Sequence, residues 1–400
     1  MTCNALVVAS TSFPSRAGDR RRLGLPSLRS DAAVRTVRLE AVSGRIARAL
    51  CGLMAASGGT AHGAPGGRGR ATVVLLQGDG RQFHDFLEGA ARNAATRAAA
   101  AEVREVLLRS STRPRVLALA RGRLTFGGRT LVMGVLNVTP DSFSDGGRHD
   151  ERRAAIERAL QMAREGAALV DIGGESTRPG AKPVPLVEEL RRVMPVLEGV
   201  VAAFRSAGGD RPIVSVDTRK AEVARRAARA GADLINDVSG LTFDPAMAAA
   251  VADSGLPVVI QHTRGTPLTM QRAPRYAHLL PDIAAFLRAQ IDRAVRAGVR
   301  EDRILIDPGI GFGKRRRDNL AILRHLRVLS SLGRPILVGA SRKSFLEGTS
   351  DGPPEGRLAS SLAAEALAIL GGADIIRAHD VREAVRVASL CDAVLRDSAP

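Results

Sequence analysis

The stretch TLVMGVLNVTPDSFSDGG, residues 130–147, indicates the fold of this 400-residue chain. An apolar run ends at a polar residue, Asn137, and an Arg- and Ala-rich amphipathic segment follows the glycines. The same arrangement recurs to the end of the chain. The eight apolar runs are 131–136, 168–172, 213–216, 233–235, 258–260, 304–306, 336–338 and 375–376. Eight alternating strand–helix units predict a closed (β/α)8 TIM barrel. A doubly wound open sheet is the alternative, but no G-x-G-x-x-G opens the first unit.

Composition excludes several classes of protein. Hydrophobic residues make up 45% and charged residues 25%, as in ordinary globular chains. No apolar run reaches the ~18–20 residues that a membrane span needs, so we expect no membrane association. The three cysteines, Cys3, Cys51 and Cys391, lie far apart, which argues against a disulfide framework or a cysteine zinc site. This pattern suits the cytoplasm.

The charge of +18 raises the question of an anionic partner. Of the 59 Lys and Arg residues only four are lysine, a skew that indicates a GC-rich coding bias. The chain has one Tyr and no Trp, and no basic run is interleaved with aromatic residues. We therefore expect no nucleic-acid partner. A nucleic-acid role for residues 1–120 stays open as an alternative, which salt-dependent binding would reveal.

Three segments are expected. Residues 1–30 form a disordered or wrongly started leader, with an organellar transit peptide as the alternative. Residues 31–120 form a small α+β N-terminal extension of unknown role, and residues 125–400 form the barrel. The elements expected in the extension are strands at 34–39 and 72–76, helices at 44–56 and 81–109, and a Gly-rich loop at 57–69.

In such a barrel the active site lies at the carboxyl ends of the strands. Every expected strand is followed by polar or ionisable residues. One alone would be a turn or capping residue, but eight together are hard to explain as caps. Four of them suit a flat heterocycle read edge-on by hydrogen bonds: Asp217, Asn236, Asp307 and Lys343. A structural ion pair between Lys343 and Asp307 is the simpler alternative.

A second set of residues suits an anion. Arg178, Arg377, His379 and a helix start after Ser341 are typical of a phosphate site. Asn137 could hold a Mg²⁺ ion that bridges phosphate oxygens, because that ion prefers oxygen ligands. His262 is interpreted as a hydrogen-bonded residue at the end of its strand rather than as a direct participant.

The ordered motifs resemble those of the dihydropteroate synthase family. They are LNVTPDSFSDGG (136–147), GESTRPG (174–180), DPGIGFGK (307–314), SRKS (341–344) and Arg-x-His-Asp (377–380). One motif alone would be weak, whereas the set in this order is specific, and the likeness covers about residues 130–385. The resemblance implies that p-aminobenzoate displaces pyrophosphate from 6-hydroxymethyl-7,8-dihydropterin diphosphate, giving 7,8-dihydropteroate.

The resemblance also implies roles for individual residues. Lys343, Asp217 and Arg178 would be catalytic, and the pterin would be held by Asp217, Asn236, Asp307 and Lys343. Thr177, Arg377 and His379 would hold the diphosphate, with Asn137 on the Mg²⁺ cofactor. Five residues would surround p-aminobenzoate: Thr177, Arg178, Pro179, Phe312 and Ser344. The loop with Pro140, Phe143, Gly146 and Gly147 would be a lid.

Family members are usually homodimers that pair outer helices and are sulfonamide targets, so a homodimer is expected here. Gln261 stands where the family commonly has Met beneath the pterin, which predicts altered packing there. Two alternatives remain. A pterin-binding methyltransferase barrel would not need Arg178 or the 341–344 segment, and a non-catalytic pterin-binding protein would not need Asn137 or Lys343.

Overall fold

The computed structural model describes residues 4–11, 34–64, 72–111, 116–119, 122–139, 148–208, 211–347 and 354–396. The chain divides into two compact units. The first comprises Met1–Arg113 and His325–Gly333, and the second comprises Pro114–Arg324 and Arg334–Pro400. The site predicted from the sequence lies in the second unit.

The first unit is an antiparallel sheet with the strand order β1-β2-β4-β3. The strands are β1 (Asn4–Thr11), β2 (Val34–Val42), β3 (Thr60–Ala64) and β4 (Thr72–Gly78), and the helices are α2 (Gly44–Ala56), α3 (Gly80–Arg92) and α4 (Arg97–Ser111). Alternate side chains of the central strands, such as Val37 and Leu76, are buried with Leu50 and Phe86 of the helices. The small α+β extension is confirmed as a fold class.

Three expectations for this unit are corrected. Asn4–Thr11 pairs with β2, so these residues are no disordered leader; residues 12–33 lie outside the described part. The expected loop at 57–69 contains β3, because small residues such as Ala61 and Gly63 fit a sheet edge beside β4. The helix expected over residues 81–109 is two helices, because the chain turns where the hydroxyl of Thr96 donates to the carbonyl of Ala90 at 2.8 Å.

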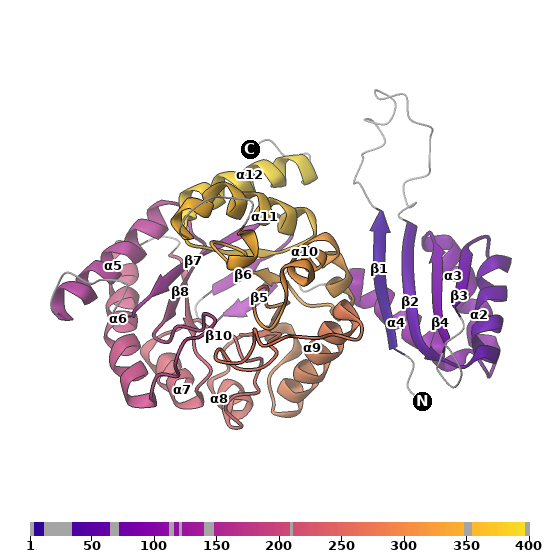
Figure 1. Ribbon diagram of the computed structural model, residues 1–400, viewed down its shortest axis with the longest axis horizontal. Helices are drawn as coiled ribbons and strands as arrows, with labels where there is room; N and C mark the ends of the chain where they lie inside the picture. Colours follow the sequence, from indigo (N-terminus) through magenta and orange to yellow (C-terminus); the bar gives the residue numbers. More distant parts are fainter. Residues whose placement is uncertain are drawn as a thin grey trace. The chain divides into compact units, whose positions relative to one another are not determined.

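The second unit contains the predicted barrel, with helices α5 to α12 around the strands (Figure 1). The strands are β7 (Leu131–Asn137), β8 (Leu169–Gly173), β9 (Ile213–Asp217), β10 (Leu234–Asp237), β11 (Val258–Gln261), β12 (Ile304–Asp307), β13 (Leu337–Val338) and β14 (Ile375–Ala378). The helices are α5 (Arg148–Arg164), α6 (Leu186–Ala207), α7 (Ala221–Ala230), α8 (Met247–Ser254), α9 (Leu279–Arg296), α10 (Arg316–Arg324), α11 (Leu358–Leu370) and α12 (Val381–Arg396).

Neighbouring strands of this sheet are parallel throughout, in the order β12-β11-β10-β9-β8-β7-β14-β13. The sheet closes where Ile306 bridges Ile336 and its amide donates to the carbonyl of Pro335 at 3.0 Å. The TIM barrel prediction is therefore confirmed. Closure brings the carboxyl ends of all eight strands to one rim.

The opposite end of the barrel is closed by a hairpin, β5 (Val116–Leu119) and β6 (Gly122–Thr125). Leu117, Leu124 and Phe126 are buried there against the first residues of the barrel strands, including Leu131 and Leu305. The expected boundary at residue 120 was therefore wrong, because burial of these apolar side chains joins the hairpin to the barrel.

Within the described ranges, no helix has both the length and the hydropathy that a membrane crossing requires.

Candidate active site

The polar residues predicted from the sequence meet at the carboxyl rim of the barrel. Asn137, Asp217 and Asp307 are the last residues of β7, β9 and β12. Asn236 lies near the end of β10, and Arg377 lies in β14. Each strand is short and buried, and the parallel register brings these strand ends to the same mouth.

A buried carboxylate that sequence reasoning did not single out connects these residues. Asp171 in β8 is fully buried and accepts three hydrogen bonds. The donors are Ser215 Oγ at 2.6 Å, Asn236 Nδ2 at 2.9 Å and Arg377 Nε at 2.7 Å. The sequence carried one signal for the importance of Asp171, because this acidic residue lies inside an apolar strand rather than after it. With its Nδ2 held by Asp171, Asn236 keeps a buried Oδ1 that has no hydrogen-bond partner among the described residues and can accept from a ligand.

Arg377 connects the two groups of residues that were predicted separately, the pterin-binding group and the anion-binding group. Its guanidinium contacts Asp171 and also donates from Nη2 to Asp217 Oδ2 at 3.0 Å. Burial raises the pKa of Asp217, and the nearby Arg377 opposes that rise. The structure therefore places the predicted anion-binding arginine directly beside a predicted pterin residue.

Lys343 lies beside the same residues. Its ammonium donates to the carbonyl of Ile310 and lies 4.7 Å from the centre of the Phe312 ring. Burial lowers the pKa of Lys343 to about 8, and Asp307 opposes that shift. Burial likewise raises the pKa of Asp307, against the effect of Lys343. An ammonium has three N–H donors, and one of them meets the carbonyl of Ile310, so the group can also donate to a substrate acceptor.

The loop after β12 is held by a second lysine. Lys314 is buried, with Nζ 2.8 Å from His262 Nδ1 and 3.0 Å from the carbonyl of Phe312. Burial lowers the pKa of His262, so its ring is neutral and accepts from the lysine. Gly309 has φ of +67°, and a Cβ there would stand 1.9 Å from the carbonyl of His262. His262 is thus hydrogen-bonded in the loop framework, as interpreted from the sequence.

The predicted anion-binding set is only partly as expected. His379 Nδ1 lies 3.2 Å from Ser341 Oγ, and burial lowers the pKa of His379 to about 3, so the imidazole is neutral. The expected helix start after Ser341 was wrong. A three-residue turn, Ser344–Leu346, stands there, and α11 begins at Leu358.

The residues expected around p-aminobenzoate lie on three loops. Thr177 is half-buried, and Arg178 and Pro179 are exposed. Phe312 is half-buried beneath Lys343, whereas Ser344 is exposed. The expected lid residues Pro140, Phe143, Gly146 and Gly147 lie outside the described residues. Gln261 is buried, and its Nε2 donates to the carbonyl of Val238 at 3.1 Å.

The donors at the rim fit a substrate-borne Mg²⁺. Asn137 offers an amide oxygen, and the described residues contain no group of three or more His, Cys, Asp or Glu placed to hold a metal. Mg²⁺ commonly keeps several waters and binds substrate phosphates rather than an all-protein cage. The amide oxygen of Asn137 is therefore a suitable single ligand for Mg²⁺.

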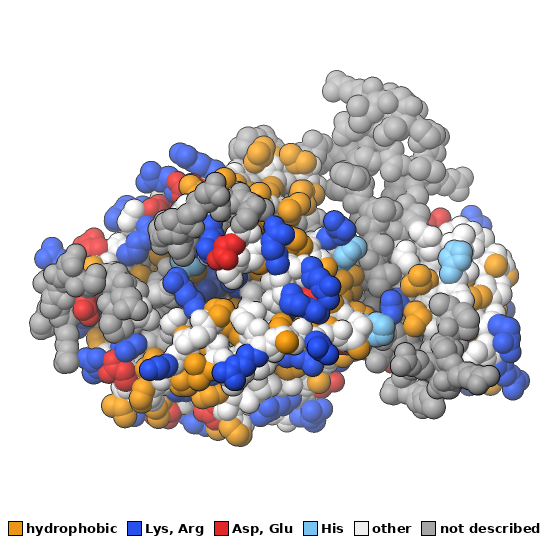
Figure 2. All heavy atoms as spheres, viewed as in Figure 1, with side chains coloured by type: hydrophobic (Ala, Val, Ile, Leu, Met, Phe, Trp, Pro, Cys, Tyr) orange, Lys and Arg blue, Asp and Glu red, His pale blue; other side chains and the backbone are white. Residues whose placement is uncertain are grey.

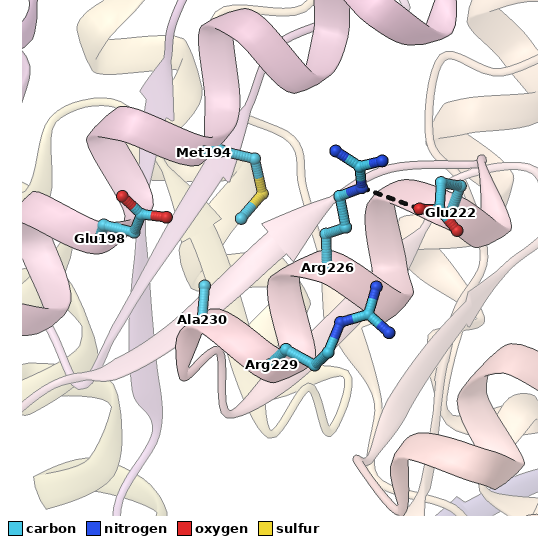
Figure 3. A pocket seen from close by; sticks show the side chains of 6 residues that line it. All are labelled: Met194, Glu198, Glu222, Arg226, Arg229 and Ala230. Atoms are coloured by element: carbon cyan, nitrogen blue, oxygen red, sulfur yellow. Dashed lines mark hydrogen bonds and ion pairs between the residues drawn. The ribbon is translucent and has the colours of Figure 1, made fainter.

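A cleft on the outside of the barrel lies apart from this rim. It is lined by Met194 and Glu198 of α6 and by Glu222, Arg226, Arg229 and Ala230 of α7 (Figure 3). Arg226 is paired there with Glu222 at 2.8 Å. None of the residues predicted to carry the chemistry lines it.

Comparisons with known proteins agree on one family. The model described as "Pterin binding enzyme" matches residues 133–379. A dihydropteroate synthase of Synechocystis is 45% identical over 71% of this chain and 96% of its own length. A Xanthomonas albilineans dihydropteroate synthase solved with 4-aminobenzoic acid is 46% identical, with a TM-score of 0.65, over 72% of this chain and all of that chain. A structure of that enzyme in complex with 7,8-dihydropteroate is 44% identical, with a TM-score of 0.63, over 71% of this chain and all of that one.

Proposed function

The chain belongs to the dihydropteroate synthase family of pterin-binding enzymes, and we propose that its strand-end residues divide the two substrates between them. The enzyme is a transferase that condenses 6-hydroxymethyl-7,8-dihydropterin diphosphate with p-aminobenzoate to give 7,8-dihydropteroate and pyrophosphate. The observation that carries the proposed division is the joined set of Asp171, Asn236, Arg377 and Asp217 at the mouth of the barrel.

The pterin is assigned to Asp217, Asn236, Asp307 and Lys343. A pterin presents ring N–H, amino and carbonyl groups along one edge. Carboxylates accept from the N–H and amino groups, and the ammonium donates to the carbonyl. The Oδ1 of Asn236, for which the described part of the chain offers no donor, supplies one further acceptor. Because Asp217, Asn236 and Asp307 are already buried, a ligand lacking its complementary donor would leave them unpaired, which gives selectivity.

The diphosphate is assigned to Arg377, Thr177 and His379. Arg377 supplies the fixed positive charge, and the neutral His379 supplies a hydrogen bond rather than a charge. Asn137 would hold Mg²⁺ on the diphosphate, and that ion would neutralise part of the leaving-group charge. These residues stabilise the charge that grows as the pyrophosphate departs.

p-Aminobenzoate is assigned to Thr177, Arg178, Pro179, Phe312 and Ser344. Arg178 pairs with the carboxylate, and the Phe312 ring packs against the aromatic ring. The solved relative with 4-aminobenzoic acid supports p-aminobenzoate as the second substrate. Lys343 lies over Phe312 and so stands between the two substrates.

The reaction then needs positioning and charge stabilisation. The carbon–oxygen bond to the diphosphate breaks, and pyrophosphate leaves with the electron pair. The electron-rich pterin shares the positive charge left on that carbon. The aniline nitrogen, a competent nucleophile at neutral pH, forms the new bond and gives up a proton. No covalent bond to the enzyme is required.

Two variants test the division of substrates. Asp307→Asn should raise the KM for the pterin diphosphate about tenfold or more, because a charged hydrogen bond contributes ~1.5–3 kcal/mol. Its KM for p-aminobenzoate should stay within about twofold of wild type, and Ser344→Ala should give the reverse pattern. Equal changes in both KM values for both variants would contradict the assignment.

We also propose a homodimer that pairs α11 and α12 with a second copy. Leu367 and Leu370 on α11 and Leu390 and Val394 on α12 are 42–70% exposed. Figure 2 shows orange side chains gathered where Figure 1 places these helices. An apolar surface shared by two packed helices favours association. Leu390→Glu should yield monomers in analytical ultracentrifugation, whereas Leu108→Glu, an exposed leucine of the first unit, should not.

The proposed location is the cytoplasm. Cys51 and Cys391 are free in the structure, which suits a reducing compartment. Thiol titration of protein isolated under alkylating conditions would find them oxidised if the proposal is wrong.

A further inference from the structure

A buried ionic network stands at the base of the loop that carries Thr177, Arg178 and Pro179. The loop runs from the end of β8 to the start of α6. Glu175 lies near the start of this loop, and its Oε1 accepts from the amide of Val184 near the other end, at 2.9 Å. One carboxylate therefore spans a separation of nine residues and fixes the distance between the two ends of the loop.

The same carboxylate is held by two cations that follow β9. Arg219 donates to it twice, from Nη2 at 2.7 Å and from Nε at 3.1 Å. Lys220 Nζ donates to Oε2 at 2.8 Å. These donors lower the pKa of Glu175 to about 2 although burial acts in the opposite direction, so it stays ionised.

Lys220 links Glu175 to a second buried carboxylate. Its ammonium is also paired with Glu189 of α6, which is fully buried and accepts from Thr218 Oγ1 at 2.6 Å. Arg219 additionally lies 3.9 Å from the centre of the Phe243 ring. The loop is thereby tied to the turn directly after β9, the strand that ends in a proposed pterin residue. Two carboxylates are balanced by two cations whose side chains are at most 11% exposed, and at such low exposure the attraction between opposite charges is strong.

The residue types found here suit a network that ties the loop to the turn after β9. A compact ammonium with three rotatable donors can reach two carboxylates on different elements, as Lys220 does with Glu175 and Glu189. Lys220 is one of only four lysines in a chain that otherwise uses arginine. Gly174, before Glu175, allows close packing, because a Cβ there would stand 2.6 Å from Val193 Cγ2.

We propose that Glu175, Lys220 and Glu189 are positioning residues for p-aminobenzoate, acting through the loop. The network holds Thr177, Arg178 and Pro179 in register with the pterin site and so sets the KM for p-aminobenzoate. This inference rests on the proposed function, which assigns those loop residues to that substrate.

Steady-state kinetics of the full chain test the inference. Glu175→Gln retains an acceptor for Val184 but loses the charge that Arg219 and Lys220 hold. Its KM for p-aminobenzoate should rise about tenfold to a hundredfold, since small displacements of a positioned group cost up to about 10²-fold. The KM for the pterin diphosphate should rise by a clearly smaller factor, because Thr177 is the only one of these three loop residues assigned to the diphosphate. Lys220→Met should reproduce this pattern, and Lys220→Arg should recover part of the affinity.

Amide hydrogen exchange of the loop supplies a second readout. In wild type the amide of Gly180 donates to the carbonyl of Pro267 at 2.9 Å, and that of Ala181 donates to the carbonyl of Arg178 at 3.0 Å. Both amides should exchange faster in Glu175→Gln, because the loop opens more often when its base is released.

Glu198→Gln is the matched control, because Glu198 is a glutamate of α6 that lines the outer cleft (Figure 3). It should match wild type in both KM values. If Glu175→Gln fails to fold, Lys220→Arg and Lys220→Met decide alone. Equal rises in both KM values, or no rise, would overturn the inference. Absence of p-aminobenzoate-dependent pyrophosphate release in wild type would instead overturn the proposed function, so the two failures are distinguishable.

Discussion

The two ends of the barrel use the same eight strands and opposite kinds of side chain. At the floor, Leu117, Leu124 and Phe126 of the hairpin segment pack against apolar residues that begin the strands. At the mouth, strands end in polar residues such as Asp217, which hydrogen-bond across the opening. The described side chains of the floor form a buried apolar cluster, whereas those of the mouth leave one acceptor, Asn236 Oδ1, without a hydrogen-bond partner.

Two neighbouring strands show that carboxylates at the mouth differ in what they face. Asp237 ends β10 and accepts from the amides of Ser239 at 2.8 Å and Leu241 at 2.9 Å. It therefore holds the turn after its strand. Asp217 ends β9 and instead faces Arg377 across the opening.

The difference between the two ends teaches where stability and activity reside. Apolar burial at the floor contributes to the free energy of unfolding and touches no substrate. Buried charges at the mouth contribute little net stability, because desolvation offsets their attraction, but they are ready to meet a polar ligand. Variants at the two ends should therefore separate the two properties.

The largest expected effect is at the floor. Phe126→Ala should lower the free energy of unfolding by about 3–5 kcal/mol, because it leaves a cavity among well-packed side chains. The kcat and both KM values of the folded enzyme should stay at wild-type levels. Urea unfolding and kinetics at low temperature measure the two properties, and a fall in kcat per folded molecule would break the comparison.

The reverse pattern is expected at the mouth. Lys343→Ala should lower kcat/KM for the pterin diphosphate by about 10²–10³-fold, the typical cost of removing one donor that stabilises charge. Its unfolding midpoint should match wild type, because the side chain is only half-buried and its surroundings already disfavour the charge. A large loss of stability with normal turnover would assign Lys343 to the framework instead.

Asp171→Asn should affect both stability and substrate binding, because the Asp171 carboxylate lies within a strand and holds Asn236 and Arg377 at the mouth. Loss of its charge beside Arg377 should cost about 1.5–3 kcal/mol of stability and also raise the KM for the pterin diphosphate. Asp233→Asn is the matched control, because Asp233 is also buried and pairs with Arg211 at 2.9 Å before β10 begins. It should lose similar stability without a change in KM.

The smallest expected effect is on the pH profile. Because the pKa of Lys343 is lowered to about 8, its ammonium is present below that pH and is lost above it. The kcat/KM for the pterin diphosphate should therefore fall above about pH 8, by about tenfold per pH unit. The activity that remains in Lys343→Arg should not fall in this way above about pH 8, since arginine keeps its charge. An unchanged fall in kcat/KM above that pH in this variant would mean that another group is titrating.

The sequence predicted the barrel and its mouth well because both depend on local patterns. Alternating apolar runs fix the strands, and parallel strands bring residues such as Asp217 and Asp307 together whatever their separation in the chain. The helix expected after Ser341 failed because a three-residue turn satisfies the backbone there.

Other features depend on contacts between distant residues and left little local signal. Asp171 reads as part of an apolar run, and only the fold brings it to Arg377, 206 positions away. The hairpin formed by β5 and β6 was assigned to the wrong unit because its partners, such as Leu131 and Leu305, lie on the barrel strands.

The most direct test of the central claim is pyrophosphate release by the full chain with the pterin diphosphate and Mg²⁺, measured with and without p-aminobenzoate. We expect release that requires p-aminobenzoate and yields 7,8-dihydropteroate in equal amount, and we expect Lys343→Ala to lose it. Tight binding of the pterin without p-aminobenzoate-dependent release would contradict that claim and indicate a binding protein built on the same barrel.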